Sequence, residues 1–217
     1  MNFVYHTLLR PGCWNLLKNC LAGLPAGEAE RIMRITSLPH RSLAVAGKLL
    51  LVNALRAHNI IKEYKLPALS YTAHKRPFIK NMPFDFNISH SGNAAVCALS
   101  LNGKIGIDIE QVKPVDTNMF DNVFTPGELA GITTDANTLL AFYKLWTAKE
   151  ATIKAEGTGF YSDARLVKIN NNKGITRNRQ WNLFPVEVNN DYVATVAVNN
   201  IYSISVSEVT MDVLMGG

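Results

Sequence analysis

The sequence lacks any apolar run of about 20 residues, the length that a membrane-crossing helix needs. Its start, Met-Asn-Phe-Val-Tyr-His, has no basic segment ahead of an apolar stretch, so no secretory signal is predicted. Disorder is not expected either, because 47% of the 217 residues are hydrophobic and only 18% are charged. We therefore expect a folded cytoplasmic protein with no membrane contact.

Cysteine and histidine are sparse and scattered. The three cysteines, Cys13, Cys20 and Cys97, are odd in number and show no CxxC spacing. The five histidines lack the i, i+4 pairing that places two metal ligands on one helix face. These absences argue against a disulfide framework, a structural zinc site and a zinc enzyme.

Positive charge exceeds negative charge, with a formal net charge of +5. The surplus favours an acidic partner, which could be a nucleic acid, a phosphorylated cofactor or an acidic protein, although ordinary solubility charge accounts for it equally well. The net positive charge is the only feature of the sequence that would support a nucleic-acid partner. The sequence has no glycine-rich phosphate loop, aromatic–basic ribbon or recognisable recognition helix, so we expect no such partner.

Hydrophobic periodicity and turn residues predict an α+β fold with antiparallel sheets. Thr125-Pro126-Gly127-Glu128 is a helix-capping sequence, and a longer helix is predicted to end at Gly157. Two alternating runs around Asn102-Gly103 predict a β-hairpin. The longer helix is expected at 137–156, and further helices at 14–21, 28–35 and 39–58. An edge strand is expected at 3–9, and an antiparallel meander at 165–169, 181–188 and 192–208.

Two carboxylates are the first candidate site residues. Asp108 and Glu110 alternate with isoleucines on a predicted strand, so their side chains point to the same side. Like charges about 7 Å apart need solvent, a cation or a metal to offset their repulsion. An all-oxygen site favours Mg²⁺, Mn²⁺ or Ca²⁺ over zinc. The alternative is the solvated polar face of an edge strand.

A third carboxylate lies on the long helix. Glu150 falls on the apolar stripe that contains Leu139, Tyr143 and Trp146, where a carboxylate needs a partner. An intrahelical ion pair with Lys154 would provide one. The other interpretation makes Glu150 a third ligand to the cation held by Asp108 and Glu110.

Residues 87–92, Asn-Ile-Ser-His-Ser-Gly, combine hydroxyls, an imidazole and a glycine at a turn between strands. The glycine permits a close backbone approach, and the combination suits phosphate contacts. Ser-Gly turns are common, however, and a lone histidine is more often structural.

Three segments together resemble the 4'-phosphopantetheinyl transferase superfamily. They are Phe-Asn-Ile-Ser-His-Ser-Gly at 86–92, Ile-Gly-Ile-Asp-Ile-Glu at 105–110 and Leu-Trp-Thr-Ala-Lys-Glu-Ala-Thr-Ile-Lys at 145–154. The length and the first half resemble the larger, monomeric, surfactin-synthetase-activator (Sfp) type. The resemblance covers about residues 39–160.

The resemblance implies two similar α+β halves, 1–103 and 104–217, related by pseudo-twofold symmetry, with coenzyme A in the cleft between them. It implies that Asp108, Glu110 and Glu150 hold Mg²⁺, or Mn²⁺, against the pyrophosphate. Further side chains are implied to contact coenzyme A: Arg41, Ser42, Arg76, Ser89, His90, Lys149 and Lys154. Arg76 stands where the family usually has lysine, which keeps the charge but changes the donor geometry.

The implied activity is transfer of the 4'-phosphopantetheine arm of coenzyme A to a serine of an acidic acyl or peptidyl carrier protein, with release of 3',5'-ADP. Glu150 is the candidate base and Lys154 the candidate catalytic cation. The carrier would serve fatty acid, polyketide or nonribosomal peptide biosynthesis. The alternative is a noncatalytic module of the same fold that binds coenzyme A or a carrier protein.

Overall fold

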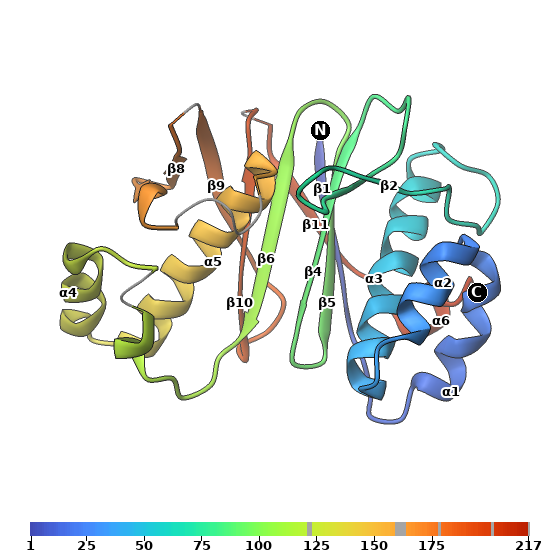
Figure 1. Ribbon diagram of the computed structural model, residues 1–217, viewed down its shortest axis with the longest axis horizontal. Coiled ribbons are helices and arrows are strands. Elements are labelled where there is room, and N and C mark those ends of the chain that lie inside the picture. Colours follow the sequence, from blue (N-terminus) through green and yellow to red (C-terminus); the bar gives the residue numbers. More distant parts are fainter. Residues whose placement is uncertain (121–122, 159–163, 178, 201, 217) are drawn as a thin grey trace.

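A computed structural model describes residues 1–217 except 121–122, 159–163, 178, 201 and 217. Figure 1 shows two groups of strands at the centre, with helices on the outer side of each group. The first part of the chain contains β1 (Asn2–Leu8), α1 (Trp14–Leu17), a 3-10 turn (Lys18–Gly23), α2 (Ala26–Met33), α3 (Leu38–Ala57), β2 (Ser70–Tyr71), β3 (Pro77–Phe78), β4 (Asp85–Ser91) and β5 (Ala94–Ser100).

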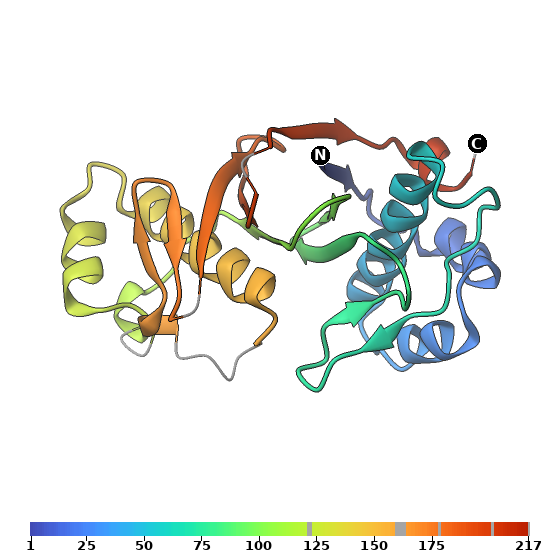
Figure 2. The same ribbon diagram turned by 90° about the horizontal axis from the view of Figure 1, so that it is seen from above.

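The second part begins with β6 and ends with a short helix beside the first part (Figure 2). Its elements are β6 (Ile105–Gln111), a 3-10 turn (Thr117–Phe120), α4 (Pro126–Thr134), α5 (Thr138–Glu156), a second 3-10 turn (Ala164–Leu166), β7 (Lys168–Asn170), β8 (Lys173–Ile175), β9 (Gln180–Val186), β10 (Tyr192–Val198), β11 (Ile204–Glu208) and α6 (Met211–Leu214). The α+β class, with antiparallel sheets packed on helices, is confirmed.

The two sheets repeat one order of elements. In the sheet β11-β1-β5-β4, strand β1 precedes α3 and the pair β4–β5; in the sheet β6-β10-β9-β8-β7, strand β6 precedes α5 and the pair β9–β10. The first strand of each set pairs antiparallel with the last, over Asn2–Leu8 against β5 and Ile105–Gln111 against β10. The chain therefore contains two similar strand–helix–hairpin units.

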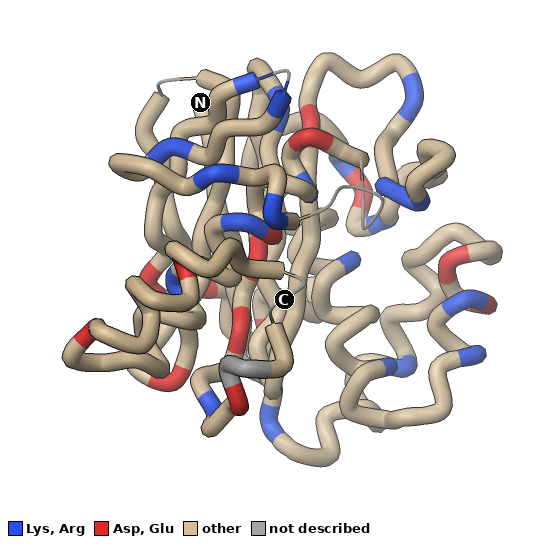
Figure 3. The backbone as a smooth tube through the Cα atoms, turned by 60° about the vertical axis from the view of Figure 1, so that its left-hand side comes forward, with Lys and Arg blue, Asp and Glu red and all other residues tan. Residues whose placement is uncertain are grey.

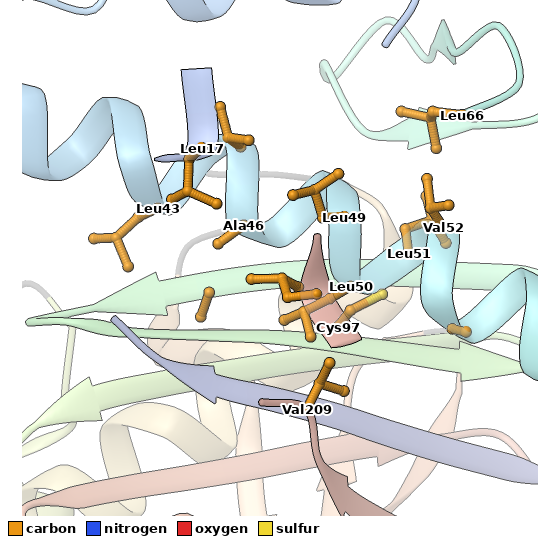
Figure 4. Packing of buried hydrophobic residues seen from close by; sticks show 14 of the residues in the cluster. Leu17, Leu43, Ala46, Leu49, Leu50, Leu51, Val52, Leu66, Cys97 and Val209 are labelled. Atoms are coloured by element: carbon orange, nitrogen blue, oxygen red, sulfur yellow. The ribbon is translucent and has the colours of Figure 1, made fainter. Parts of the chain in front are cut away.

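Apolar side chains fill the space between the sheets and beneath each helix. Ile105, Ile107 and Ile109 of β6 pack with residues of β1, β5 and β10 between the two sheets, and all three are fully buried. Figure 4 shows Leu43, Ala46 and the other buried residues of α3 that pack on the first sheet. Each sheet is thus covered by apolar side chains on both faces along its central strands.

Helix boundaries follow the local signals. Thr125 and Glu128 form the predicted reciprocal capping box at the start of α4. Helix α5 ends at Gly157, whose φ of 81° is readily adopted only by glycine. Among the described residues, no helix combines the length and the hydrophobicity that crossing a membrane requires.

The predicted hairpin around Asn102-Gly103 is wrong. Strand β5 pairs on one side with β1 and on the other with β4, so its backbone has no free edge for β6. Strand β6 pairs instead with β10 in the other sheet. The turn residues therefore join two sheets rather than two paired strands.

Two further strand predictions need correction. Residues 3–9 do not form an edge strand, because β1 lies between β11 and β5. The antiparallel pairing of 181–188 with the first part of 192–208 is confirmed as β9 and β10. The segment 165–169 is instead the end of a 3-10 turn followed by the start of β7, an unpredicted strand β8 lies between β7 and β9, and the segment 192–208 divides between the sheets. Its last part, β11, pairs parallel with the free edge of β1. It does not extend the second sheet at β6, because the N–H groups at that edge of β6 already donate to side chains of β4.

Candidate active site

Strand β6 presents two carboxylates on its outer face. Asp108 is 3% exposed and Glu110 is half-buried, while the isoleucines that alternate with them, Ile107 and Ile109, face the core. The alternation predicted for this strand is therefore confirmed. Because the outer face of β6 lies under helix α5, both carboxylates are directed towards that helix rather than into open solvent.

Gly106 brings the helix close to the strand. A Cβ atom at this position would overlap the backbone of Ala151 and Ala155. Only glycine allows this approach, so α5 packs directly on the β6 backbone. Residues four apart share a helix face, and Trp146, Glu150 and Lys154 consequently line the side of α5 that faces the carboxylates.

Lys154 joins the helix to both neighbouring strands. Its Nζ donates to Asp108 Oδ1 at 2.5 Å and to Ser89 Oγ at 3.0 Å, and Ser89 Oγ also donates to Asp108 Oδ1 at 3.0 Å. The Lys154 side chain is 28% exposed, so the ion pair lies at the edge of solvent. The intrahelical ion pair with Glu150 is not the one that forms, because Lys154 is paired with Asp108.

Glu150 lies in an unfavourable environment for a charged carboxylate. It is 8% exposed, and no described residue donates a hydrogen bond to it. Burial is the largest cause that raises the pKa of Glu150. The negative charge of Asp108 and, to a smaller extent, that of Glu110 also raise this pKa, whereas the positive charge of Lys154 lowers it. Such a group holds a proton more readily than an exposed glutamate does, which suits proton transfer.

Glu110 is held by two donors. Ser91 Oγ donates to its Oε2 at 2.7 Å, and Trp146 Nε1 donates to its Oε1 at 3.4 Å. Burial nevertheless raises the pKa of Glu110, and the charge of Asp108 adds to that effect. The three carboxylates therefore repel one another and would be stabilised by a cation.

The donor set fits a hard divalent cation. Asp108 Oδ2 is buried and has no hydrogen-bond partner among the residues that the structure describes, which leaves one oxygen free for a ligand. The atoms of Asp108, Glu110 and Glu150 that could ligate a metal are all carboxylate oxygens, which Mg²⁺ and Mn²⁺ prefer. In the described part of the chain no three acidic, histidine or cysteine side chains are already gathered as metal ligands. The ammonium of Lys154 is instead bound to Asp108 Oδ1.

His90 lies at the side of this cluster that faces α3. Desolvation lowers its pKa, and the nearby positive charges of His40 and Lys154 lower it further. Ser89 faces Asp108, whereas the next residue, His90, points to the opposite side of β4. The structure thus brings Ser89 and Lys154 together with Asp108, whereas His90 lies on the other face of β4, where the charges of both His40 and Lys154 reach it.

Lys149 is not in that neighbourhood. Its side chain is buried, and its Nζ forms an ion pair with Glu128 Oε2 at 2.8 Å. The same ammonium donates to the carbonyl oxygens of Val123 and Ala164 and lies over the ring of Phe124. The implied phosphate contact is replaced here by internal contacts that connect α4 to α5.

The guanidinium of Arg41 is bound to protein carbonyls. It donates to the oxygens of Met33 and Ile35 and lies over the ring of Trp14. Ser42 is buried, and its hydroxyl donates to the carbonyl oxygen of Leu38. Both residues stabilise the start of α3, next to His40.

Arg76 connects the two sheets. Its Nη2 donates to Asp85 Oδ2 at 2.6 Å in β4 and to the carbonyl oxygen of Ile105 at 2.7 Å in β6. Nη1 is buried without a partner. Asp85, Asn87 and Ser91 of β4 also face β6 and accept hydrogen bonds from its backbone. None of the three is a site residue predicted from the sequence, although their alternation with Phe86 and Ile88 indicates that they share one face.

A cavity of about 880 Å³ lies away from this cluster, between α5 and strands β9 and β10. Leu140, Lys144, Leu183 and their neighbours line it. A second cavity, of about 520 Å³, lies between the loop after β1 and the start of α3. We place the candidate site at the carboxylates because charged and polar groups converge there, whereas cavity size alone does not indicate chemistry.

Comparison with known families divides the chain into two matches. The model described as "4'-phosphopantetheinyl transferase superfamily" matches residues 104–197, and the one described as "4'-phosphopantetheinyl transferase, N-terminal" matches residues 13–102. A solved structure, the holo-[acyl-carrier-protein] synthase of Thermotoga maritima, aligns with a TM-score of 0.36 and 17% identity over 44% of this chain and 61% of its own.

Known relatives match over longer stretches. The 4'-phosphopantetheinyl transferase AcpT of Escherichia coli is 35% identical over 63% of this chain and 67% of its own length. HetI of Nostoc is 28% identical over 84% of this chain and 81% of its own length. The match to AcpT of Salmonella typhi, at 35% identity, spans 59% of that relative's length. The chain belongs to the 4'-phosphopantetheinyl transferase superfamily.

Proposed function

We propose that this protein transfers the 4'-phosphopantetheine arm of coenzyme A to a serine of an apo carrier protein and releases 3',5'-ADP. The observation that carries the proposal is the cluster of Asp108, Glu110 and Glu150 beside Lys154, where β6 meets α5. Family membership supports the same reaction. The active site would lie in the cleft between the halves 1–103 and 104–217.

Asp108, Glu110 and Glu150 would hold Mg²⁺, with Mn²⁺ as a substitute. When bound, the cation would offset negative charge on the pyrophosphate of coenzyme A. The free Asp108 Oδ2 and the mutual repulsion of the carboxylates support this assignment. Lys154 would then exchange part of its contact with Asp108 for a phosphate oxygen.

Glu150 would accept the proton of the carrier serine. Without metal, burial and the neighbouring carboxylates raise its pKa, and the absence of donors among the described residues leaves its carboxylate available to a cation or a proton. Lys154 would stabilise the charge that develops on the phosphates during attack. The nucleophile belongs to the carrier, so this chain needs no catalytic serine.

Coenzyme A would be held by side chains on the first half. Ser89 and His90 flank Lys154 and would contact the phosphates, with Arg41 and Ser42 beside them on the first turns of α3. Arg76 would contribute near the far end of β6, where one guanidinium nitrogen lacks a partner. The basic surplus of the chain would attract an acidic carrier surface, and Figure 3 shows its lysines and arginines spread among acidic residues.

The test is intact-protein mass spectrometry of an apo carrier protein incubated with coenzyme A, Mg²⁺ and this protein. We expect the carrier to gain the mass of one phosphopantetheine group, and a carrier with its serine replaced by alanine to gain nothing. Heat protection by coenzyme A without any transfer, across acyl and peptidyl carriers, would support the noncatalytic binding module instead. Size-exclusion chromatography would test the expected monomer.

A further inference from the structure

The edge of β6 that faces β4 is joined to it by side chains. On its other edge β6 forms a backbone ladder with β10. On the β4 side, the backbone N–H groups of Ile105, Ile107 and Gln111 donate to side-chain oxygens of β4. We call these three bonds the β4–β6 contact.

The acceptors of the β4–β6 contact lie on one face of β4. They are Asp85 Oδ2 at 3.0 Å, Asn87 Oδ1 at 3.0 Å and Ser91 Oγ at 3.1 Å. The spacing of two residues along a strand directs all three towards β6. Buried N–H groups that lack an acceptor are costly, so these side chains replace the missing backbone partner.

Asn87 differs from the other two acceptors. Asp85 is shared with Arg76, and Ser91 is shared with Glu110. Asn87 is 6% exposed, and within the described residues its side chain forms one hydrogen bond, in which its Oδ1 accepts from Ile107 N–H. Ile107 directly precedes Asp108, and its own side chain is fixed in the core between the sheets. A change at Asn87 therefore alters the support of β6 without removing a group from the cluster.

We propose that Asn87 is a positioning residue, whose bond to Ile107 sets the direction in which Asp108 and Glu110 project towards Glu150. This inference rests on the proposed divalent-cation site. Loss of the acceptor would leave Ile107 N–H unsatisfied and let β6 shift away from β4. Groups that hydrogen-bond metal ligands typically change metal affinity by about 10–100-fold, and we expect an effect of this size from the bond that fixes the backbone directly before Asp108.

The test measures Mn²⁺ binding by the loss of the free-ion electron paramagnetic resonance signal, with saturating coenzyme A. We expect Asn87→Ala to weaken Mn²⁺ binding at least about 10-fold. The matched control is Asn53→Ala, which removes bonds to the Leu49 carbonyl at 3.0 Å and to the Tyr64 hydroxyl at 2.9 Å within the first half. The control should lose stability but keep the affinity of the wild type.

A second variant covers the case in which Asn87→Ala does not fold. Asn87→Asp retains the oxygen that accepts from Ile107, so it should fold, protect the Ile107 amide from hydrogen exchange, and bind Mn²⁺ at least as tightly as the wild type. Weakened binding by Asn87→Asp, or equal losses in Asn87→Ala and Asn53→Ala, would overturn the inference.

The inference and the proposed function can fail separately. Wild-type transfer combined with unchanged Mn²⁺ affinity in Asn87→Ala would overturn only the positioning role. A wild type that binds Mn²⁺ through an Asn87-dependent site but modifies no carrier would overturn only the transfer reaction. A wild type that binds no Mn²⁺ would overturn the positioning role and the metal assignment together.

Discussion

Helix α5 has two faces that use the same residue types differently. On the face towards β6, Lys154 is partly exposed and pairs with Asp108, while none of the described residues donates a hydrogen bond to Glu150. On the face towards α4, Lys149 is buried and is paired with Glu128 and two carbonyl oxygens. Charge at an exposed edge with unsatisfied partners is available for a ligand, whereas charge that is fully paired in the interior serves stability.

The comparison predicts that substitutions on the side of α5 towards β6 and on the side towards α4 affect different quantities. Asp108→Ala should abolish carrier modification, because it removes the acceptor of Lys154 and the free oxygen proposed for the cation. Excess chelator should have the same effect on the wild type, with recovery on adding Mg²⁺. Mass spectrometry of the carrier measures the modification in both cases. Normal turnover by Asp108→Ala in excess chelator would contradict the metal assignment.

Glu150→Gln should separate catalysis from folding. The amide keeps the volume but accepts no proton and is a poorer metal ligand, so the transfer rate should fall by a factor on the order of 10² or more. Stability without metal should not fall, since burial already disfavours the charge. Both quantities should be measured on one preparation at saturating carrier, and an unchanged rate constant would assign Glu150 a purely structural role.

Lys149→Met should show the opposite pattern. Methionine fills much of the volume but leaves the carbonyl oxygens of Val123 and Ala164 without the ammonium and Glu128 with only Thr125 as a donor among the described residues. We expect a cost of about 2–3 kcal/mol in the free energy of unfolding. The rate constant for transfer should stay within about twofold of the wild type, because the ammonium does not reach the carboxylates. Urea unfolding and transfer kinetics provide the two measurements.

The matched control for Lys149→Met is the double variant with Glu128→Gln. It removes both charges, so part of the lost stability should return. A large fall in the transfer rate of Lys149→Met at unchanged stability would show that the buried face takes part in catalysis, against the comparison.

The smallest expected effect is a dependence of stability on pH. A carboxyl group whose pKa is raised in the folded state contributes stability below its ordinary pKa of 4.5, and that contribution is lost as pH rises through the raised value. Without metal, the wild type should therefore lose stability relative to Glu150→Gln as pH rises above 4.5 towards neutrality.

Urea unfolding of both proteins across this pH range measures the difference. Stabilisation by Mg²⁺ should grow over the same range, because the cation binds the deprotonated carboxylate. A stability difference between the two proteins that does not change with pH would mean that Glu150 titrates normally.

Local sequence determined the parts of the site that depend on periodicity. Alternation of isoleucine with Asp108 and Glu110 defined the outer face of β6, and the helical spacing placed Glu150 on the packed face of α5. The capping residues fixed the start of α4 and Gly157 the end of α5. These features depend on backbone geometry over a few residues, which a sequence records directly.

Only the tertiary structure decided what each face meets. Asn102-Gly103 has the composition of a hairpin turn, yet β6 leaves β5 because both edges of β5 are already paired. Lys149 and Lys154 look alike in the sequence, but α4 lies against one and β4 against the other. Pairing between distant strands and helices depends on competition for edges and surfaces across the whole chain, and no local pattern contains that information.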